Sequence, residues 1–256
     1  MNLTKAQLEA LCVNRFPRSS KYNQQWVLEN RMGPNPMWLV EWLSEAMDFK
    51  PGMRVLDLGC GTAITSIFLA KEFGVQVWAT DSSTWTKIAG ENWPRICDAG
   101  VADRVFPIRA NAHALPYAEE FFDAMVSIDA YHYFGTSDAY LLGFHKYVKS
   151  GGQVGIVVPG LMQEVEREPP EHLKEWWGAE CYSFHTASWW RWHWEKTKRV
   201  DVEVADTLED GWRYWFLFEE ISRATGIAVM SEDEQHVVGV DEGRYLGFVR
   251  VVARRQ

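Results

Sequence analysis

The sequence predicts an α/β fold in which a mostly parallel sheet of seven strands carries helices on both faces. Strand-like runs alternate with helical patterns between about residues 53 and 159, and strands joined by helical crossovers lie parallel. Two further strand-like runs follow later in the chain. The size agrees, because 256 residues with 47% apolar side chains can bury the core of one large domain.

Five short apolar runs rich in β-branched residues form the predicted core of the sheet, and they are 53–58, 75–80, 104–109, 122–128 and 153–158. The third run contains Pro107, which has no N–H to donate to a neighbouring strand. We therefore expect this strand near an edge of the sheet.

The segments outside this core are predicted to be helical additions and two late strands. Asn35 and Pro36 form a helix start, and an apolar stripe follows it as far as Met47. Downstream we expect a helix at 188–196, a strand at 200–204, a helix at 212–224 and a last strand at 244–253. We divide the single domain 1–256 into an N-terminal helical lid (1–50), a core (51–159), cap insertions around a helix and a strand (160–242) and the last strand (243–256).

Composition excludes several classes of protein. Basic residues number 26 and acidic residues 35, so a net charge of −9 disfavours a general nucleic-acid binder. The four cysteines form no C-x-x-C pair, which favours a reducing compartment, and we expect a cytoplasmic protein. No apolar run reaches the roughly 18 residues of a membrane helix, and the first residues lack the apolar stretch of a signal peptide. We expect no stable membrane insertion.

The segment 55–62 carries the clearest chemical signal, because it runs from a strand through glycines into a helix. Glycines let a ligand approach the backbone, and a helix start offers free N–H groups. A dinucleotide fingerprint would have glycine or alanine at position 64, where this chain has Ile64. Asp81 ends the second strand 22 positions after Gly59, a spacing that suits ribose hydroxyls. Asp57 would be unfavourable beside a pyrophosphate and favourable beside an ammonium group.

Together these residues suit S-adenosyl-L-methionine, which has an amino-acid tail, a ribose and an adenine. Segment 55–62 with Asp81 resembles motifs I and II of the class I S-adenosylmethionine-dependent methyltransferases, and segments 109–116, 121–124 and 149–152 extend the likeness. The resemblance covers roughly residues 35–160 and is greatest to the small-molecule and cyclopropane-fatty-acyl-phospholipid-synthase-like branches. It implies a Rossmann-like fold whose core, 51–159, binds the cofactor.

The resemblance also implies roles for individual residues. The methionine end of the cofactor would be held by the loop residues Asp57, Gly59, Cys60, Gly61 and Thr62. Asp81 would bind the ribose hydroxyls. The adenine would be surrounded by Ser82, Asn111, Ala112 and His113, with Asn111 standing where many relatives have aspartate. Tyr22, together with Trp26, resembles an N-terminal lid over the cofactor. We expect Cys60 to act through its backbone, because no activating partner for its thiol is evident.

The loop after the fourth strand is the predicted acceptor site, because open α/β sheets bind ligands beyond the carboxyl ends of their strands. His132 is either a general base or a pocket residue that only hydrogen-bonds. Asp129 either neighbours the cofactor, orients His132 or caps a turn. Tyr131 and Tyr133 are candidates for positioning the acceptor, the former in catalysis and the latter in substrate binding, and the alternative for at least one of them is an aromatic residue that only fills space. The loop lacks the Asp/Asn-Pro-Pro-aromatic and Pro-Cys sequences of base methylation, and no residues have the spacing of a metal site.

Tryptophan is unusually frequent, with 14 in the chain and eight of them between Trp176 and Trp215. Those at 189, 190, 192 and 194 spread over about 200° of a helix, which is wider than one buried face. Either the helix is wedged between sheet and cap, or the rings line a substrate pocket. In the second case His185, Trp190 and Trp194 would contact an aromatic or cationic acceptor.

The leading hypothesis is a methyltransferase that acts on the nitrogen, oxygen, sulfur or carbon of a small molecule. One alternative is C-methylation or cyclopropanation of a lipid-like acceptor. Two others are a non-catalytic S-adenosylmethionine-binding module and an NAD-dependent oxidoreductase. The acceptor and the oligomeric state stay open.

Overall fold

A mixed sheet forms the centre of the protein. The computed structural model describes residues 2–82, 92–227 and 233–256, and in them seven strands pair in the order β3-β2-β1-β4-β5-β7-β6. Their bounds are β1 (Arg54–Leu58), β2 (Gln76–Asp81), β3 (Val105–Arg109), β4 (Phe122–Ile128), β5 (Val148–Leu161), β6 (Val200–Thr207) and β7 (Leu246–Arg255). The first five strands are parallel, and β7 runs antiparallel to both β5 and β6. The predicted fold class is confirmed.

Pro107 lies where its chemistry predicts. β3 forms one edge of the sheet and pairs with β2 alone, with Pro107 opposite Ala79. The side of β3 that faces away from β2 therefore needs no donor from Pro107.

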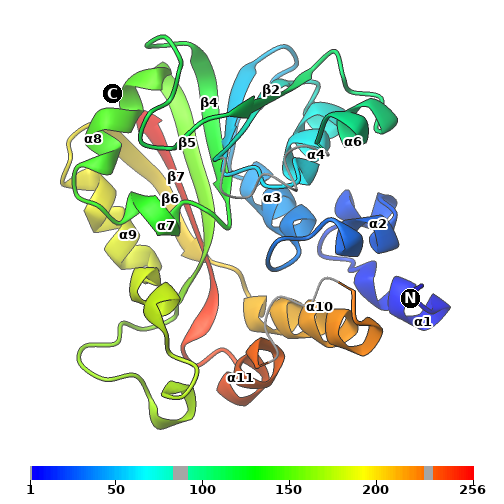
Figure 1. Ribbon diagram of the computed structural model, residues 1–256. Coiled ribbons are helices and arrows are strands. Elements are labelled where there is room, and N and C mark those ends of the chain that lie inside the picture. The colour runs from blue at the N-terminus through cyan, green and yellow to red at the C-terminus, as the bar shows by residue number, and fades with distance from the viewer. Residues whose placement is uncertain (1, 83–91, 228–232) are drawn as a thin grey trace.

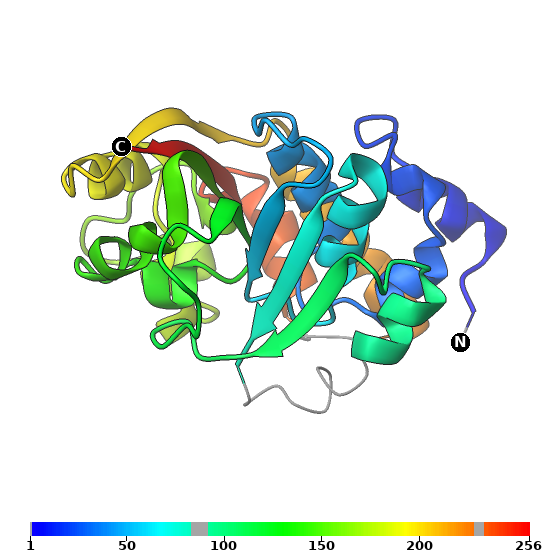
Figure 2. The ribbon, with the colours of Figure 1, turned by 90° about the horizontal axis from the view of Figure 1, so that it is seen from above.

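Helices cover both faces of the sheet, and strand residues alternate between two cores. On one face lie α3 (Pro36–Ser44), α4 (Ile64–Phe73), α6 (Asn92–Asp98) and α10 (Gly211–Thr225). On the other lie α8 (Tyr140–Phe144) and α9 (Ala187–Glu195). Val55 of β1 belongs to the first core and Leu56 to the second, as the period of two in a strand requires. Figure 2 shows the two layers from above, with the chain termini on opposite sides.

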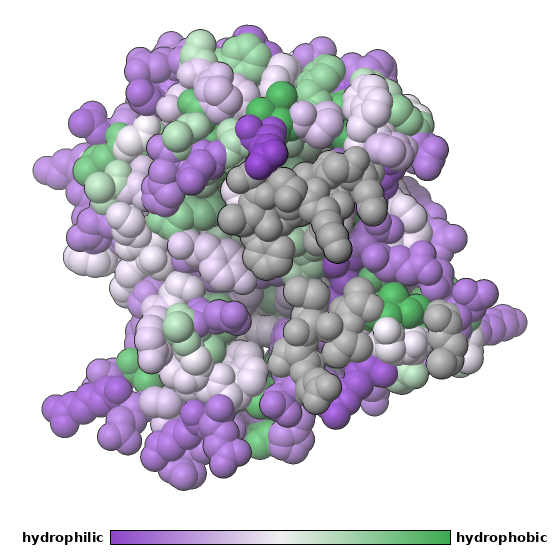
Figure 3. Space-filling view, viewed as in Figure 1, coloured by the Kyte–Doolittle hydropathy of each residue, from purple (hydrophilic) through white to green (hydrophobic). Residues whose placement is uncertain are grey.

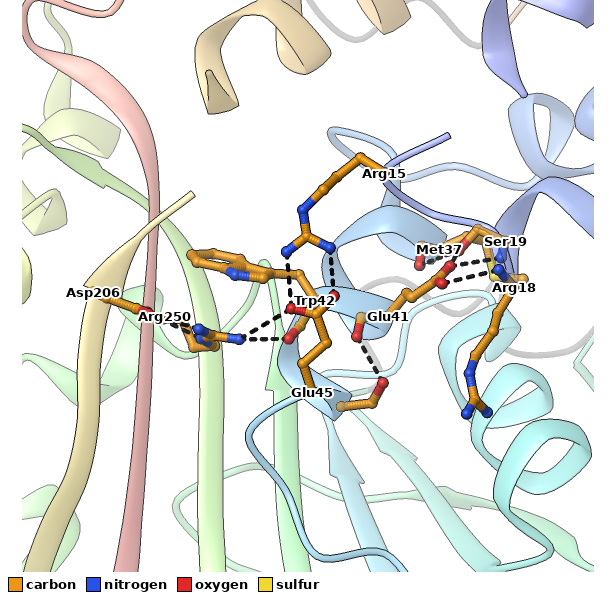
Figure 4. A network of polar contacts seen from close by, with 10 residues as sticks. Arg15, Arg18, Ser19, Met37, Glu41, Trp42, Glu45, Asp206 and Arg250 are labelled. Atoms are coloured by element: carbon orange, nitrogen blue, oxygen red, sulfur yellow. Dashed lines mark hydrogen bonds and ion pairs between the residues drawn. The ribbon is translucent and has the colours of Figure 1, made fainter. Parts of the chain in front are cut away.

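The N-terminal segment, with α1 (Lys5–Leu11) and α2 (Gln24–Glu29), is fastened to α3 by buried polar contacts (Figure 4). The carboxylate of Glu41 accepts hydrogen bonds from the backbone N–H and the hydroxyl of Ser19, at 2.7 and 2.6 Å. On the sheet side, Arg250 of β7 donates to the carbonyl of Trp42 at 2.7 Å and pairs with Asp206 of β6. Because such buried groups are costly to leave unpaired, the contacts fix α3 between the N-terminal helices and the sheet.

Two helices occupy the excursion between β6 and β7, namely α10 and α11 (Glu234–Asp241). The excursion begins and ends at neighbouring positions, because Thr207 is paired with Val249 and the N–H of Leu208 donates to the carbonyl of Phe248 at 3.1 Å. Figure 1 places both helices below the sheet, with α10 close to α1.

The surface and the helix lengths agree with the composition. On the face seen in Figure 3, polar side chains dominate, and apolar ones form small separate patches. Within the described ranges, no helix has both the length and the apolar character needed to cross a membrane.

Candidate cofactor and acceptor site

The glycine loop between β1 and α4 lies in close contact with two other segments. Gly59 and Gly61 have φ values of +78° and +50°, which residues other than glycine rarely adopt. A Cβ atom on Gly59 would overlap the side chain of Ala130, in the loop after β4. A Cβ atom on Gly61 would stand 2.6 Å from the sulfur of Met32. The two glycines therefore let three loops meet beyond the carboxyl ends of β1 and β4.

Asp57 is fully buried at the end of β1, and only one of its oxygens is engaged. Oδ2 accepts hydrogen bonds from the hydroxyls of Thr65 and Ser66 on the first turn of α4, both at 2.6 Å. Oδ1 has no hydrogen-bond partner among the described residues. Burial raises the pKa of this carboxyl to about 6, against the lowering effect of the two hydroxyls. A buried oxygen of this kind, next to the glycine loop, fits a cofactor that brings its own donor, such as an ammonium group.

Asp81 ends β2 next to the glycine loop. Its Oδ2 accepts from the N–H of Gly61 at 2.7 Å, and its Oδ1 accepts from the N–H of Ser82 at 2.6 Å. Partial burial raises the pKa of Asp81, and the two N–H donors counteract this. Among the described residues each carboxylate oxygen accepts one of these two hydrogen bonds, and a carboxylate oxygen has a second lone pair that can accept from a hydroxyl group of a ligand.

Of the predicted adenine residues, Ser82 follows β2, and Asn111, Ala112 and His113 follow the neighbouring strand, β3. The N–H of Ala110 donates to the carbonyl of Asp81 at 2.8 Å, which brings the end of β3 beside the end of β2. Asn111 is exposed, and its side-chain oxygen accepts from the N–H of His113 at 2.9 Å. The structure thus brings Ser82, Asn111, Ala112 and His113 to the same edge of the sheet as the glycine loop.

Cys60 and Thr62 belong to the wall of the loop. The Cys60 side chain is buried, and burial raises the pKa of its thiol well above the ordinary value. Thr62 points away from the sheet, and its hydroxyl donates to the backbone carbonyl of Asn30 at 2.6 Å. Neither side chain presents a reactive group, which agrees with the backbone role predicted for Cys60.

Asp129 stands at the end of β4 with a φ of +54°, and its N–H donates to the carbonyl of Val157 at 2.8 Å. No hydrogen bond joins its carboxylate to His132 among the described contacts, so the prediction that Asp129 orients His132 is not supported. Instead the carboxylate faces Gly33. Burial and the nearby carboxylates of Glu234 and Glu219 raise its pKa well above the ordinary value, against the effect of Arg31.

His132 begins the short helix α7 (His132–Gly135) and is 2% exposed. Its Nδ1 has no hydrogen-bond partner within the described part of the chain, and its ring lies 4.0 Å from that of Tyr133. Burial lowers the pKa of His132 to about 3, so its imidazole is neutral at physiological pH. A neutral imidazole can accept a proton but is a weak base at this pKa.

Tyr131 lies in the core, which does not support a role in catalysis and agrees with the alternative that one of the two tyrosines only fills space. It is fully buried, and its ring packs 5.8 Å from Trp190 and 5.6 Å from Trp194. A Cβ atom on Gly135 would overlap the Tyr131 ring, so that glycine provides the space for it. The sequence left this choice open, because exposed and buried aromatic residues look alike in a loop sequence.

Tyr133, in contrast, is 64% exposed and borders a group of carboxylates. Partial burial raises the pKa of its phenol, and so do Asp129, Glu180 and Glu234. Glu180 lies on the 3-10 turn η5 (Ala179–Ser183) and Glu234 begins α11. Segments distant in sequence therefore place negative charge around the phenol of Tyr133.

The placement of the tryptophan helix α9 agrees with the first alternative, in which the helix is wedged between sheet and cap. Trp190 and Trp194 are fully buried in the core between α9 and the sheet, which does not support their predicted role as substrate contacts. Trp192 on the opposite side is 59% exposed. Trp189 is stacked between two histidine rings, those of His185 at 3.7 Å and His193 at 4.4 Å. The substrate role of His185 stays a prediction.

Tyr22 lies away from the glycine loop. Its hydroxyl donates to Glu72 at 3.2 Å and its ring packs beside Phe68, so it contacts the far half of α4. This placement does not support a contact between Tyr22 and the cofactor. The segment that does reach the loop is Asn30–Gly33, whose signal in the sequence was Gly33, a glycine that allows close approach of another chain segment.

A buried ion pair near Asp129 was also missed. Arg31 donates through both terminal nitrogens to the carboxylate of Glu219 on α10, and the two side chains are 0% and 2% exposed. Neither residue belongs to a motif, so their pairing depends on the tertiary fold. Among the described residues, no group of three or more His, Cys, Asp or Glu side chains could hold a metal ion.

Comparisons with known proteins agree with this geometry. Residues 55–152 match the family model described as "Methyltransferase domain". The methyltransferase GfsG of Streptomyces halstedii is 30% identical over 131 residues, which cover 50% of this chain and 46% of that protein. The ubiquinone/menaquinone biosynthesis C-methyltransferase UbiE of Shewanella sp. (strain ANA-3) is 31% identical over 113 residues, which cover 43% and 44%. The aligned part thus spans less than half the length of these curated relatives.

A solved structure extends the likeness of the fold to almost the whole chain. Phosphoethanolamine N-methyltransferase 2 of Haemonchus contortus, in complex with S-adenosyl-L-methionine, superposes with a TM-score of 0.72 at 19% identity. The superposition covers 98% of this chain and 60% of that one. At this identity the likeness concerns the fold.

Proposed function

Residues 55–152 form a methyltransferase domain of the class I, S-adenosylmethionine-dependent type, and we propose that this chain methylates a small-molecule nucleophile. The observation that carries the proposal is the buried Oδ1 of Asp57, which has no hydrogen-bond donor among the described residues and lies next to a loop with two glycines of positive φ. An ammonium group of the cofactor would satisfy this oxygen.

Residues at the ends of β1 and β2 would bind different parts of the cofactor. Asp57, held by Thr65 and Ser66, would bind the ammonium group. The first turn of α4 offers N–H groups to a carboxylate. Asp81, held by the N–H groups of Gly61 and Ser82, would accept from ribose hydroxyls. When bound, S-adenosylmethionine supplies a methyl group on a positively charged sulfur, so that the carbon–sulfur bond breaks as the bond to the acceptor forms.

The loop after β4 would position the acceptor. The contact between Ala130 and Gly59 places this loop directly against the glycine loop, so an acceptor bound at Asp129 and Tyr133 would adjoin the methionine end of the cofactor site. The loop would align the nucleophile and exclude water, which are the main contributions an enzyme makes to an in-line displacement. A proton released by the acceptor would pass to the neutral His132 or to Asp129.

The charges around Tyr133 favour an acceptor that is uncharged or cationic. Asp129, Glu180 and Glu234 lie near its phenol, and the guanidinium of Arg31 is already paired with Glu219. An anionic acceptor would be repelled by these carboxylates, whereas an ammonium group or a neutral aromatic ring would be tolerated or attracted.

Binding and transfer test the proposal separately. We expect S-adenosylhomocysteine to bind in isothermal titration calorimetry, and Asp81→Ala to weaken binding by about 1.5–3 kcal/mol, the value of hydrogen bonds to a charged group. Asp98→Ala, at an exposed position near the end of α6, is the matched control. Transfer from methyl-labelled cofactor is then measured into panels of amines, phenols, carbon nucleophiles, unsaturated lipids, carboxylates and phosphates.

The outcomes separate the alternatives. Transfer into amines, phenols or carbon nucleophiles supports the proposal, and preferential transfer into lipids favours the lipid-like alternative. Binding without transfer into any panel would favour the non-catalytic module. Stabilisation by NADH but not by S-adenosylhomocysteine would contradict the proposal altogether.

A further inference from the structure

The segment Asn30–Gly33, here called the strap, connects α2 to α3 and lies across the glycine loop. Its first residue is fixed by two side chains from the cofactor side. The carbonyl of Asn30 accepts from the hydroxyl of Thr62, and its side-chain oxygen accepts from Nε of Arg95, both at 2.6 Å. Arg95 also donates to the carbonyl of Thr62 at 3.0 Å. The strap, the glycine loop and α6 therefore share one set of hydrogen bonds.

The far end of the strap touches both halves of the site. The sulfur of Met32 occupies the space that a Cβ atom on Gly61 would need. Gly33 is packed against the carboxylate of Asp129, with no room for a Cβ atom between them. A displacement of the strap would therefore loosen its contact with the glycine loop and with Asp129 together.

Between these contacts, Arg31 points away from the loops toward α10. Its bidentate ion pair with Glu219 is buried, and its guanidinium lies 5.0 Å from the centre of the Phe218 ring. A buried ion pair adds little stability compared with apolar residues of similar size, because both charges lose their hydration. Its bidentate geometry does fix the direction of both side chains. The pair is therefore better explained as a device that sets position than as a source of stability.

We propose that Arg31 and Glu219 are a positioning pair that holds the strap on the glycine loop and beside Asp129, and so couples α10 to the retention of the cofactor. This inference rests on the proposed function, because it assumes that the glycine loop binds S-adenosylmethionine. With the pair intact, the strap limits the escape of the cofactor. It also keeps the loop after β4 aligned with the bound cofactor. Without the pair, the protein folds but holds the cofactor loosely.

The test removes the pair without leaving a buried charge. In the double variant Arg31→Met/Glu219→Leu, we expect the melting temperature to stay near or above that of the wild type. Stopped-flow displacement should show S-adenosylhomocysteine leaving about tenfold or more faster, with a correspondingly weaker Kd. With an acceptor found by the transfer assay, kcat should fall about ten- to hundredfold, because misplaced groups lose alignment, while the acceptor KM changes less.

A second ion pair provides the control. Arg15→Met/Glu45→Leu makes the same substitutions at a bidentate pair that joins the N-terminal segment to the C-terminal end of α3 (Figure 4). This control should leave cofactor release unchanged. Arg31→Lys, which keeps the charge but loses the bidentate geometry, should give intermediate release if position is what matters.

Three results would overturn the inference, and a fourth concerns its premise. Wild-type release rates in the folded double variant would make the pair merely structural, and so would faster release in the Arg15/Glu45 control. If the double variant does not fold, Glu219→Gln replaces it, and unchanged release in that variant would be equally decisive. If the wild type itself fails to bind S-adenosylhomocysteine, the proposed function is wrong, and that outcome is recognised before any variant is compared.

Discussion

Gly33 lies so close to Asp129 that a Cβ atom on residue 33 would overlap Oδ2 of the carboxylate. The two residues come from the strap and from the loop after β4, and nothing in the local sequence of either indicates the other. This contact makes Gly33 a sensitive place to displace the Asp129 carboxylate without replacing a polar residue.

For Gly33→Ala we expect a large loss of activity and a small loss of stability. The carboxylate can rotate away from the new methyl group, so the cost should be about 1 kcal/mol, at the low end for overpacking. The rotated carboxylate no longer faces the acceptor, and kcat should fall about tenfold or more. Gly143→Ala is the control, because no atom lies within 4 Å of its added methyl group. Equal activity in both variants would contradict a role for Asp129.

Gly61→Ala tests the glycine loop against a matched glycine elsewhere. Gly61 and Gly100 both have positive φ, at +50° and +70°, but only Gly61 has a neighbour in the way of a Cβ atom. Both substitutions should cost about 1–2 kcal/mol of stability because of the left-handed backbone. Calorimetry should detect weakened binding of S-adenosylhomocysteine in Gly61→Ala only. If Gly100→Ala weakened binding as much, general strain and not the loop would be responsible.

The pH dependence of cofactor binding should report on Asp57. Its pKa is raised to about 6, so the folded protein without ligand binds this proton more tightly than the unfolded chain does. Its contribution to stability is therefore full below the unfolded pKa near 4 and is lost as the pH rises through 6. An ammonium ligand needs the ionised form, so affinity for S-adenosylhomocysteine should fall up to about tenfold per unit below pH 6. Asp57→Asn should bind weakly with a flatter profile, whereas Asp98→Asn should keep the wild-type profile.

His132 should change the pH dependence of stability in the direction opposite to that of Asp57. Its pKa is lowered to about 3, so between pH 3 and 6.5 the unfolded chain binds a proton that the folded protein excludes. The wild type should lose about 2–3 kcal/mol from this residue between pH 7.5 and 4.5, as measured by urea unfolding. His132→Phe should lose correspondingly less, and His236→Phe, at an exposed histidine of α11, should behave as the wild type. If kcat fell below about pH 6.5 in the wild type but not in His132→Phe, His132 would titrate in the complex.

Replacing two tryptophans of α9 by leucine should reduce stability by very different amounts. Trp190→Leu removes a fully buried ring and should destabilise the protein by about 2–4 kcal/mol. Trp192→Leu removes an exposed ring whose main partner is the ammonium of Lys196 at 4.4 Å, and it should cost about 1 kcal/mol or less. Denaturant unfolding measures both. A loss of acceptor affinity in a stable Trp190→Leu variant would restore the pocket interpretation.

The strands and the cofactor loop could be predicted because their signals are local. Pro107 indicated an edge strand. The run from Asp57 to Thr62 combines glycines with an acidic residue, and few ligands other than S-adenosylmethionine suit that combination. Trp190 and Trp194 could not be assigned, because a core helix and a pocket wall have the same periodicity. Arg31 and Glu219 gave no signal at all, since an ion pair between distant elements exists only once the sheet has brought them together. Asp129 was found, but its positive φ could not be foreseen, because aspartate tolerates that conformation without requiring it.

The excursion that carries α10 and α11 leaves the sheet after Thr207 and returns before Val249, its partner in the β6–β7 ladder. A segment whose ends are neighbours can be lengthened, shortened or exchanged with little change in the entropy of closing it. Replacement of the whole segment as one cassette would therefore leave the strand register and the glycine loop unchanged. The Arg31–Glu219 pair sets the limit on such exchange, because an incoming cassette must supply a partner for Arg31.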